Sequence, residues 1–433
     1  MKLDGCSFTM LRIWPRGIAR LMVDTHTPNT RYSVLVVGLL SLNFGILFFD
    51  RNSASFLMPF VKPDLGLSNT QVGLTASALS LCWALAALFI GMAADRGGSR
   101  KGYLLGATVA FSACSFLTGI AGSFAMFVGA RMLMGFAEGG VAPISQSITA
   151  LSVPPSRRGL AMGVMQNLGS NLLGSFVAPV VLVAIAKNWG WQKAFFLAGV
   201  PGLISALLLW YFVHEPEEAA RGTRIAEPLK SRLKEILRHR NMTLCAVISV
   251  LLVSYLVTCW TFAPLFLTQV RGFAPETMGW LMSALGVSAA VGSFVVTGLS
   301  DRIGRKPVMI VISFLGVILP LGALYYTGSP WVLAAIFFFG WALTGLFPLF
   351  MGTIPSETVS LRHMTTAMAL VMGAGEVFGG VLAPTLAGWA ADRAGLTAPM
   401  WIMLGLCVSA GVLALGLTET APARTALAAE EPA

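Results

Sequence analysis

Long apolar runs alternate with short polar breaks along most of this chain. From Ser33 onward the runs are about 20 residues or longer, which is the length an α-helix needs to cross the hydrocarbon core of a bilayer. Charged residues and Pro/Gly-rich stretches separate the runs. The pattern predicts twelve membrane-spanning helices, over residues 33–58, 72–94, 102–121, 124–150, 159–186, 194–213, 243–269, 276–299, 307–327, 330–354, 364–391 and 397–417.

One long polar connection divides these runs into two groups of six. The expected parts are a cytoplasmic arm (1–32), an N-terminal six-helix bundle (33–213), a cytoplasmic linker (214–242), a C-terminal six-helix bundle (243–417) and a disordered tail (418–433). Within the linker, leucines and isoleucines recur at helical spacing among basic residues, which indicates an amphipathic helix on the membrane surface. A plain solvated linker is the alternative reading. The spaced residues are Leu229, Leu233, Ile236 and Leu237.

The two groups of six repeat each other. The segment GMAADRGGSRK, which begins at Gly91, recurs as GLSDRIGRK from Gly298, 207 residues later. Gly174 and the following Ala178-Pro179 recur as Gly379 and Ala383-Pro384, at an offset of 205. Parallel repeats of six helices predict two pseudo-symmetric bundles with an axis along the membrane normal and a substrate cavity between them near the midplane.

Composition and charge support a membrane protein and exclude other classes. Hydrophobic residues make up 56% of the 433 residues and charged residues 11%, which is too apolar for a soluble globular domain. The net charge of +10 would suggest nucleic-acid binding in a soluble protein. Here the basic residues gather in alternate loops, so they report topology and no nucleic-acid partner. We expect a monomer in the inner (plasma) membrane, in contact with the lipid bilayer, with both termini cytoplasmic.

The residue types that metals and nucleophilic enzymes require are poorly placed. The 6 cysteines stand singly, and the 4 histidines lie in predicted loops or at helix edges. Because no Ser/His or Cys/His arrangement and no metal cluster has a credible spacing, the sequence predicts neither an enzyme nor a metal site. Any coupling to protons must therefore use carboxylates.

Four charged residues stand inside the first and fourth predicted helices. A charge at membrane depth costs about 3 kcal/mol or more, so it persists when it is paired or faces water, and it is a functional candidate by default. Two arginines beside a cavity predict an anion site, and two carboxylates would be its titrating partners. A static salt-bridge cluster that ties the two helices together is the alternative. The four residues are Asp50, Arg51, Arg131 and Glu138, of which the last two are seven residues apart and so share one helix face.

Four more polar residues are candidates for substrate contacts. Gln166 and Asn171 lie on the fifth predicted helix and Tyr255 on the seventh. A hydrogen bond that packs two helices together is an equally good reading of each of these three residues. Glu376, on the eleventh helix, aligns with Asn171 at the offset of 205. It either binds substrate hydroxyls, adds a proton site, or serves as a structural acid bonded to a backbone amide.

The two repeated segments, GMAADRGGSRK and GLSDRIGRK, resemble the signature loop of the major facilitator superfamily, and the resemblance covers nearly the whole chain. It implies an all-α membrane fold of twelve helices in two bundles. It also assigns the motif residues to gating, as ion pairs that latch the cytoplasmic side. In the first copy Gly98-Ser99 departs from the pattern, which would weaken that latch. The gating candidates are Asp95, Arg96, Arg100, Asp301, Arg302 and Arg305.

Two other segments give a narrower likeness. Phe48-Phe49-Asp50-Arg51-Asn52 and Arg131-Met-Leu-Met-Gly135-Phe-Ala-Glu138-Gly139 resemble the anion:cation symporter family, which includes sugar-acid/proton symporters and sialin-type carriers. The likeness implies that the carboxylates of these segments couple protons and that their arginines bind the anion. Spinster-type lipid transporters share a similar arrangement, so the motifs indicate coupling better than cargo.

The sequence thus predicts proton-coupled symport of a small organic anion, such as a sugar acid or an aromatic acid, by alternating access. Protons are the coupling ion and no other cofactor is expected. Two alternatives stay open: a proton-coupled transporter or exporter of lipid or drug-like amphiphiles, and a non-transporting membrane sensor built on the same fold.

Overall fold

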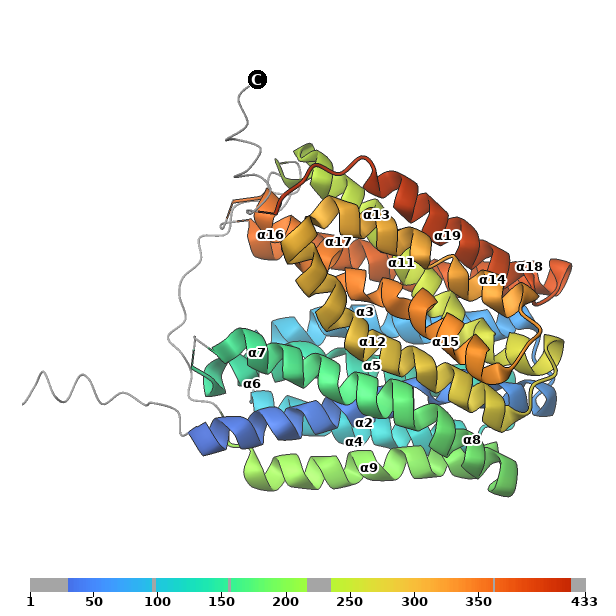
Figure 1. The fold of residues 1–433 in the computed structure, drawn as a ribbon. Helices are drawn as coiled ribbons and strands as arrows, with labels where there is room; N and C mark the ends of the chain where they lie inside the picture. Colours follow the sequence, from blue (N-terminus) through green and yellow to red (C-terminus); the bar gives the residue numbers. More distant parts are fainter. Residues whose placement is uncertain (1–29, 96–98, 155–156, 216–234, 361–362, 422–433) are drawn as a thin grey trace, which may run out of the picture.

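Helices account for the regular structure of this protein. The computed structural model describes residues 30–95, 99–154, 157–215, 235–360 and 363–421, and within these ranges it contains helices and no strand. The first half of the chain (blue to green) and the second half (yellow to red) form two bundles side by side (Figure 1). The expected all-α fold is confirmed. Most of the expected arm, of the linker with its amphipathic helix, and of the tail lies outside the described residues.

Six spans make up the first half. Three of them are single helices: α2 (Thr30–Asp64), α3 (Asn69–Asp95) and α4 (Arg100–Gly119). The fourth span joins α5 (Phe124–Gly139) to α6 (Val141–Ser152). The fifth runs through α7 (Arg158–Gly163), the π-helical stretches η2 (Val164–Leu168) and η3 (Ser170–Val177), and α8 (Ala178–Trp189). The sixth is α9 (Trp191–Phe212).

The second half follows the same plan. Its first two spans are α11 (Arg240–Leu265) with the π-helical η4 (Phe266–Val270), and α12 (Pro275–Ile303). The third joins α13 (Arg305–Leu315) to α14 (Ile318–Tyr325). The fourth contains α15 (Pro330–Trp341), η5 (Ala342–Leu346), η6 (Leu349–Thr353) and α16 (Ile354–Thr358). The fifth contains α17 (Met364–Ala374), the π-helical η7 (Gly375–Gly380) and α18 (Val381–Ala394), and the sixth is α19 (Ala398–Ala414).

The lengths of these helices suit a bilayer. Among the described residues, 11 helical stretches are at least 18 residues long and apolar enough to cross a membrane. The remaining one, α19, has 17 residues, so it extends about 25 Å, near the lower limit for a span. The expected set of twelve spans therefore agrees with the structure.

The first helix is longer than the sequence pattern predicts. The apolar run indicates 33–58, but α2 continues to Asp64 and contains Pro59 and Pro63. A proline removes one backbone hydrogen bond and usually ends a helix in water. In a bilayer the helix continues, because an unwound backbone would find no water to replace its hydrogen bonds.

The two halves repeat each other in their packing as well. A Cβ added at Gly174 would lie 2.5 Å from the Cβ of Phe48, so α2 and η3 touch at backbone distance. At the corresponding place in the second half, a Cβ added at Gly379 would lie 2.7 Å from the carbonyl oxygen of Val250 in α11. Glycine is required at both positions because any side chain would force the two helices apart.

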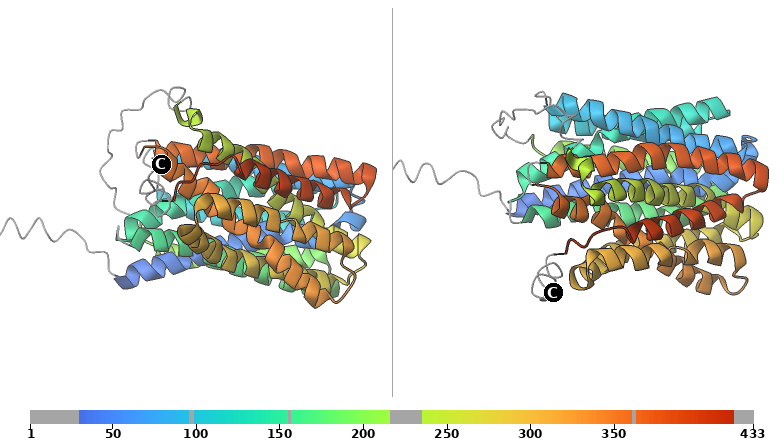
Figure 2. Two further views of the ribbon diagram at one scale, coloured as in Figure 1. Left: turned by 45° about the horizontal axis from the view of Figure 1, so that its top comes forward. Right: turned by 90° about the horizontal axis from the view of Figure 1, so that it is seen from above.

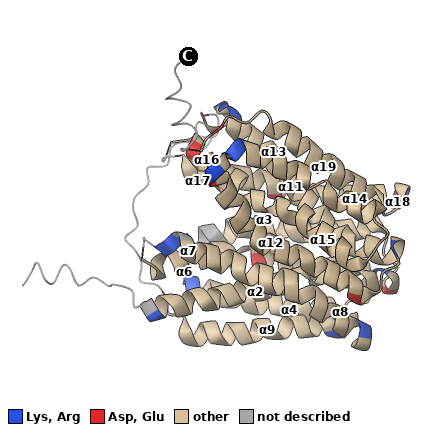
Figure 3. Cartoon of the chain, viewed as in Figure 1, with Lys and Arg blue, Asp and Glu red and all other residues tan. Residues whose placement is uncertain are grey.

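The outward surface of the helices is apolar, as in a protein surrounded by lipid. Large apolar side chains that are mostly exposed include Leu207, Tyr211, Phe294, Trp331 and Leu386. Figure 3 shows Lys and Arg mostly at the two ends of the helices. An apolar belt between charged ends is the surface of a multi-pass membrane protein.

Both ends of the described chain lie on one side of the molecule. Figures 1 and 2 show that α2 begins, and the chain leaves α19, at the same end of the helices, and that the helices run roughly along one direction. We call this the termini end and the opposite one the far end. In Figure 1 the ribbons of the two halves lie closer together at the far end than at the termini end.

Candidate functional site

A cavity of about 590 Å3 lies between the two halves, as the repeat predicts. Its first wall comes from α2, α3, α5 and the η2/η3 region, and its second wall from α11, α12, α15 to η6, and α17/η7. Five of the predicted site residues line it: Arg51, Arg131, Gln166, Asn171 and Glu376. The volume fits a small organic molecule.

The four intramembrane charges form one cluster between α2 and α5. Arg51 donates a hydrogen bond from Nη1 to Oε2 of Glu138 at 3.4 Å, and this contact is an ion pair. Arg131 donates from Nη2 to the backbone carbonyl of Arg51 at 2.5 Å, and its Nη1 lies 2.9 Å from the sulfur of Met134. Glu138 is fully buried, whereas the Arg51 side chain is 17% exposed. The cluster therefore has an accessible cation in front of a buried carboxylate.

Asp50 lies behind the cavity wall. Its Oδ1 accepts a hydrogen bond from the Ser115 hydroxyl of α4 at 2.6 Å, and the carboxylate is fully buried. Asp50 and Glu138 each keep one carboxylate oxygen that has no hydrogen-bond partner among the described residues. Such an oxygen is where a proton would be added. Neither carboxylate lines the cavity, so the arginines separate both from a bound molecule.

Arg51 also lies over aromatic rings. Its guanidinium carbon is 5.2 Å from the ring centroid of Trp83 and 6.0 Å from that of Phe48. Both rings line the cavity. Aromatic faces stabilise a guanidinium without occupying its N–H groups. The N–H groups that do not bond Glu138 therefore stay available for an anion.

Tyr255 does not belong to the cavity, and this corrects the sequence prediction. The side chain is fully buried, and its hydroxyl donates to the backbone carbonyl of Gly316 at 2.9 Å. Its ring packs near Trp341, with centroids 6.0 Å apart. Tyr255 thus makes a hydrogen bond that packs two helices together. The sequence could not distinguish such a bond from a substrate contact.

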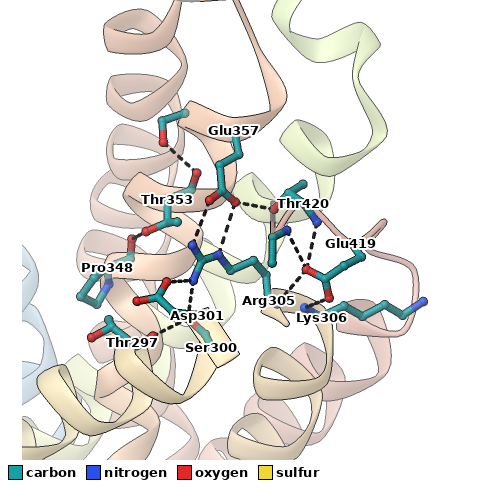
Figure 4. A network of polar contacts seen from close by, with 12 residues as sticks. Thr297, Ser300, Asp301, Arg305, Lys306, Pro348, Thr353, Glu357, Glu419 and Thr420 are labelled. Carbon is teal, nitrogen blue, oxygen red and sulfur yellow. Dashed lines mark hydrogen bonds and ion pairs between the residues drawn. The ribbon is translucent and has the colours of Figure 1, made fainter. Parts of the chain in front are cut away.

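The second copy of the repeated motif forms a polar network at the termini end (Figure 4). Arg305 forms ion pairs with Asp301, one turn earlier, and with Glu357 of α16 at 2.9 Å. The Thr420 hydroxyl donates to the same Glu357 carboxylate at 2.6 Å. Arg302, in contrast, is exposed. Arg305 and Asp301 therefore join three segments of the second half.

A carboxylate also caps the helix that follows each motif. Glu419 accepts backbone N–H bonds from Arg305 at 2.8 Å and Lys306 at 3.2 Å, at the first turn of α13. In the first half Glu215 accepts from the backbone N–H groups of Arg100 at 2.7 Å and Lys101 at 2.9 Å, at the first turn of α4. Of the other gating candidates, Arg96 lies outside the described residues, and only the backbone of Asp95 is described.

The sequence did not predict the polar seal between the halves at the far end. Asp392 of α18 accepts backbone N–H bonds from Asn69 and Thr70 at 2.8 Å each, and the Thr70 hydroxyl at 2.5 Å, so it caps α3 of the other half. Lys187 of α8 pairs with Glu276 of α12. The offset of 205 aligns Lys187 with Asp392, a signal that was present in the sequence.

Backbone contacts support this seal. A Cβ added at Gly279 of α12 would lie 3.0 Å from the carbonyl oxygen of Pro179 of α8, and one added at Gly73 of α3 would collide with the carbonyl of Pro384 in α18. Both pairs cross between the halves and correspond in the repeat. The cavity is thus closed toward the far end by close backbone packing and by ionic contacts.

Metal ligands are lacking around this site. Within the described ranges no group of three or more His, Cys, Asp or Glu side chains is arranged to hold a metal ion. The side chains that are present can bind an anion through guanidinium groups and exchange protons at carboxylates.

Comparison with known proteins gives the same outline. The family model described as Major Facilitator Superfamily matches residues 40–274 and 256–433. A probable sulfoacetate transporter of Cupriavidus necator is 26% identical over 89% of this chain and 93% of its own length. The 3-(3-hydroxy-phenyl)propionate transporter of Escherichia coli is 30% identical over 70% of this chain and 74% of its own.

Two further likenesses concern cargo class and fold. A multidrug resistance protein of Salmonella dublin is 28% identical over 66% of this chain and 72% of its own length. Among solved structures, an inward-facing bacterial homologue of the human lysosomal transporter Spinster superposes with a TM-score of 0.71 at 20% identity, over 89% of this chain and 95% of that one. At this identity the likeness shows the fold alone.

Proposed function

Because this chain belongs to the Major Facilitator Superfamily, we propose that it is a secondary transporter that moves a small organic anion together with protons by alternating access. It is a membrane transporter by family, not an enzyme. The observation that carries the proposal is the Arg51–Glu138 ion pair at the cavity wall, in which the arginine is accessible and the carboxylate is buried.

The anion is proposed from the cavity and from the relatives. Two guanidinium groups on one wall match the geometry and charge of a carboxylate or sulfonate. Sulfoacetate and 3-(3-hydroxyphenyl)propionate, which two relatives are named for, are small organic anions. We therefore place Arg51 in direct contact with the anion. Arg131, whose N–H groups bond the Arg51 carbonyl and Met134, positions Arg51.

Protons couple to the anion through competition for Arg51. With Glu138 ionised, its charge holds Arg51 away from the substrate, because opposite charges attract strongly in a low-dielectric site. Protonation of Glu138 removes that charge and frees the guanidinium for the anion. Asp50, next to the same backbone segment, is the second proton-accepting carboxylate. Protons are the only coupling ion in this scheme.

The orientation of the protein in the membrane is proposed from its charges, and its conformational state from the closed end. We propose that the termini end faces the cytoplasm of a bacterial inner membrane, because that end has the larger share of the basic residues. The structure then has its far end sealed and corresponds to an inward-facing state. Because one chain builds the entire cavity, the monomer is the proposed transporting unit.

Export of a drug-like amphiphile is the second candidate. The multidrug resistance relative and the apolar second wall of the cavity, with Trp260, Phe347 and Met351, favour it. The two candidates differ in what Arg51 does. An anion needs the guanidinium, whereas a neutral or cationic amphiphile gains nothing from it.

Glu138→Gln tests the proposal. The amide cannot release a proton, so we expect no uphill anion uptake into proteoliposomes under an inward proton gradient, while exchange of labelled for unlabelled anion across the membrane continues. A panel of sulfoacetate, hexuronates and hydroxyphenylpropionates supplies the substrates. Glu235→Gln, at an exposed carboxylate of the termini end, is the matched control and should transport normally. Uphill uptake by Glu138→Gln would refute the coupling role.

A further inference from the structure

Charge is sorted between the two walls of the cavity. Among the described residues that line it, three are charged: Arg51 and Arg131 on the wall of the first half, and Glu376 on the wall of the second. The first wall is also rich in amide and hydroxyl groups. The second wall is mainly aromatic and aliphatic around its single carboxylate, with Trp260, Trp341, Phe347, Met351 and Met372.

Glu376 is placed to contact a ligand. It lies in η7, and its side chain is partly exposed to the cavity. Its carboxylate accepts no hydrogen bond from any residue in the described ranges, unlike Asp50, which has Ser115. A Cβ added at Gly380, one turn on, would lie 3.3 Å from Oε2 of Glu376 and 3.8 Å from the Ser80 hydroxyl of α3. Glycine at this position leaves the space that the carboxylate uses.

A carboxylate such as Glu376 is unfavourable in a cavity that binds anions. It repels the anionic group of the substrate, so it weakens binding unless the substrate also offers it a hydrogen-bond donor or a positive charge. The two arginines face it from the opposite wall. A molecule that spans the cavity can therefore place its anionic group against Arg51 and a donor against Glu376, with its body between the apolar side chains of the second wall.

We infer that Glu376 determines specificity: it selects acids with a single anionic group that have a flat apolar body and a hydrogen-bond donor, a hydroxyl or an ammonium group, at the end remote from the acid group. This deepens the proposed function and rests on it. A site built to hydrogen-bond a hydroxyl group discriminates strongly against the analogue that lacks it, because the site group is then left without a partner. An anionic group in place of the hydroxyl meets direct charge repulsion.

Three acids that share one skeleton and differ at the meta position of the ring test the selection. They are 3-(3-hydroxyphenyl)propionate, 3-phenylpropionate, which lacks the donor, and 3-(3-carboxyphenyl)propionate, which adds a second anion. Their binding to purified protein is measured by quenching of tryptophan fluorescence, and their uptake is measured in proteoliposomes. We expect the wild type to prefer the hydroxylated acid over the other two by about tenfold or more.

Glu376→Gln should reduce the preference for the hydroxylated acid over 3-phenylpropionate to about threefold or less, because an amide is a weaker acceptor for the hydroxyl. It should raise affinity for the dicarboxylate about tenfold, because the repelling charge is gone. Glu376→Asp retains the charge on a shorter side chain, so it should still reject the dicarboxylate. This second variant separates loss of charge from loss of fold.

Two results overturn the inference, and they are distinguishable. If the wild type takes up acids with proton coupling but shows the same ratios as Glu376→Gln, Glu376 does not select the substrate, while the proposed function stands. If the wild type binds and moves none of these acids or the other panel anions, the proposed function fails and the inference fails with it.

Discussion

Two arginines share the cavity wall but use their hydrogen-bonding capacity differently. Arg131 is 2% exposed and donates to the Arg51 carbonyl and to the Met134 sulfur. Arg51 makes one long contact with Glu138 and otherwise lies over aromatic rings. Arg51 therefore has N–H groups available to bind an anion, although both residues carry the same charge.

Arg51→Lys should weaken binding of the anion by about tenfold, because an ammonium group keeps the charge but cannot form the two parallel hydrogen bonds of a guanidinium. The thermal stability of the purified protein should change little. The measurement is quenching of tryptophan fluorescence on titration with the acid, with Trp83 next to Arg51 as a reporter. Arg238→Lys, at an exposed position of the termini end, is the control. Unchanged affinity in Arg51→Lys would show that the anion binds elsewhere.

At this scale the sequence located residues whose type is costly in lipid, and it misplaced one whose type is not; the transport roles of the charged residues stay predictions. Charges inside apolar runs identify Asp50, Arg51, Arg131 and Glu138 without a structure, because a membrane span rarely keeps a charge that has no function. Tyr255 carries no such cost. Since α11 is apolar on nearly every side, its pattern does not reveal which face meets the cavity, and the prediction for Tyr255 was wrong.

At the scale of elements, two short polar segments hold the ends of long helices. Glu215 follows α9 and caps α4, and Glu419 follows α19 and caps α13. The last span of each half is thereby tied to the third. Burial alone would raise the pKa of Glu419, but the backbone N–H groups of Ala421, Arg305, Lys306 and Thr420 outweigh it and hold this pKa below its ordinary value.

Glu419→Gln should lower the unfolding temperature of the purified protein at neutral pH, by the equivalent of about 1 kcal/mol or less for a lost cap at a partly exposed site. Because the pKa of Glu419 is depressed in the folded protein, the stabilisation is present above its ordinary value of 4.5 and is lost as the pH falls through the folded value. The difference between wild type and variant should therefore shrink below pH about 4.5. A difference that stays constant with pH would contradict this role of the cap.

Element positions followed from the sequence more closely than element ends did. The number and order of spans came from apolar runs and from the 205-residue repeat, since a membrane leaves few other ways to bury such runs. The ends were less predictable. Prolines such as Pro59 read as helix breaks in water, yet α2 continues past them.

At the scale of the whole molecule, the halves meet at a polar seal that closes the cavity toward the far end. Asp392 reaches across to the first turn of α3, and Lys187 pairs with Glu276 at the related place. Both contacts connect loops or helix ends whose sequences contain no recognisable motif. Charged residues at helix ends are common in membrane proteins, so composition gave no reason to choose these ones. The 205-residue offset relates Lys187 to Asp392, but it does not show which groups of the other half they contact.

Asp392→Asn should shift the protein toward the state that is open at the far end, by about 1 kcal/mol or roughly fivefold in population, because a charged acceptor of three hydrogen bonds becomes neutral. Spin labels at Asn188 of α8 and Ala394 of α18, in a variant without native cysteines, would report a larger share of long distances. Asp64→Asn is the matched control: Asp64 bonds Trp191 within the first half at 2.7 Å, so it should leave the distances unchanged. Unaltered distances in Asp392→Asn would exclude a role in closure.

The π-helical stretches have a mechanical consequence. Asn171 lies in η3 and Glu376 in η7, at corresponding positions of the two halves. A π-helical turn interrupts the regular hydrogen-bond ladder of an α-helix, and such interruptions are among the places where helices kink. Asn171 and Glu376, which line the cavity, thus lie at the points where the helical ladder of each span is interrupted. A bound molecule that draws the two cavity walls together would bend these spans at the π-helical turns. The free energy that this bending costs would then have to come from the binding of that molecule.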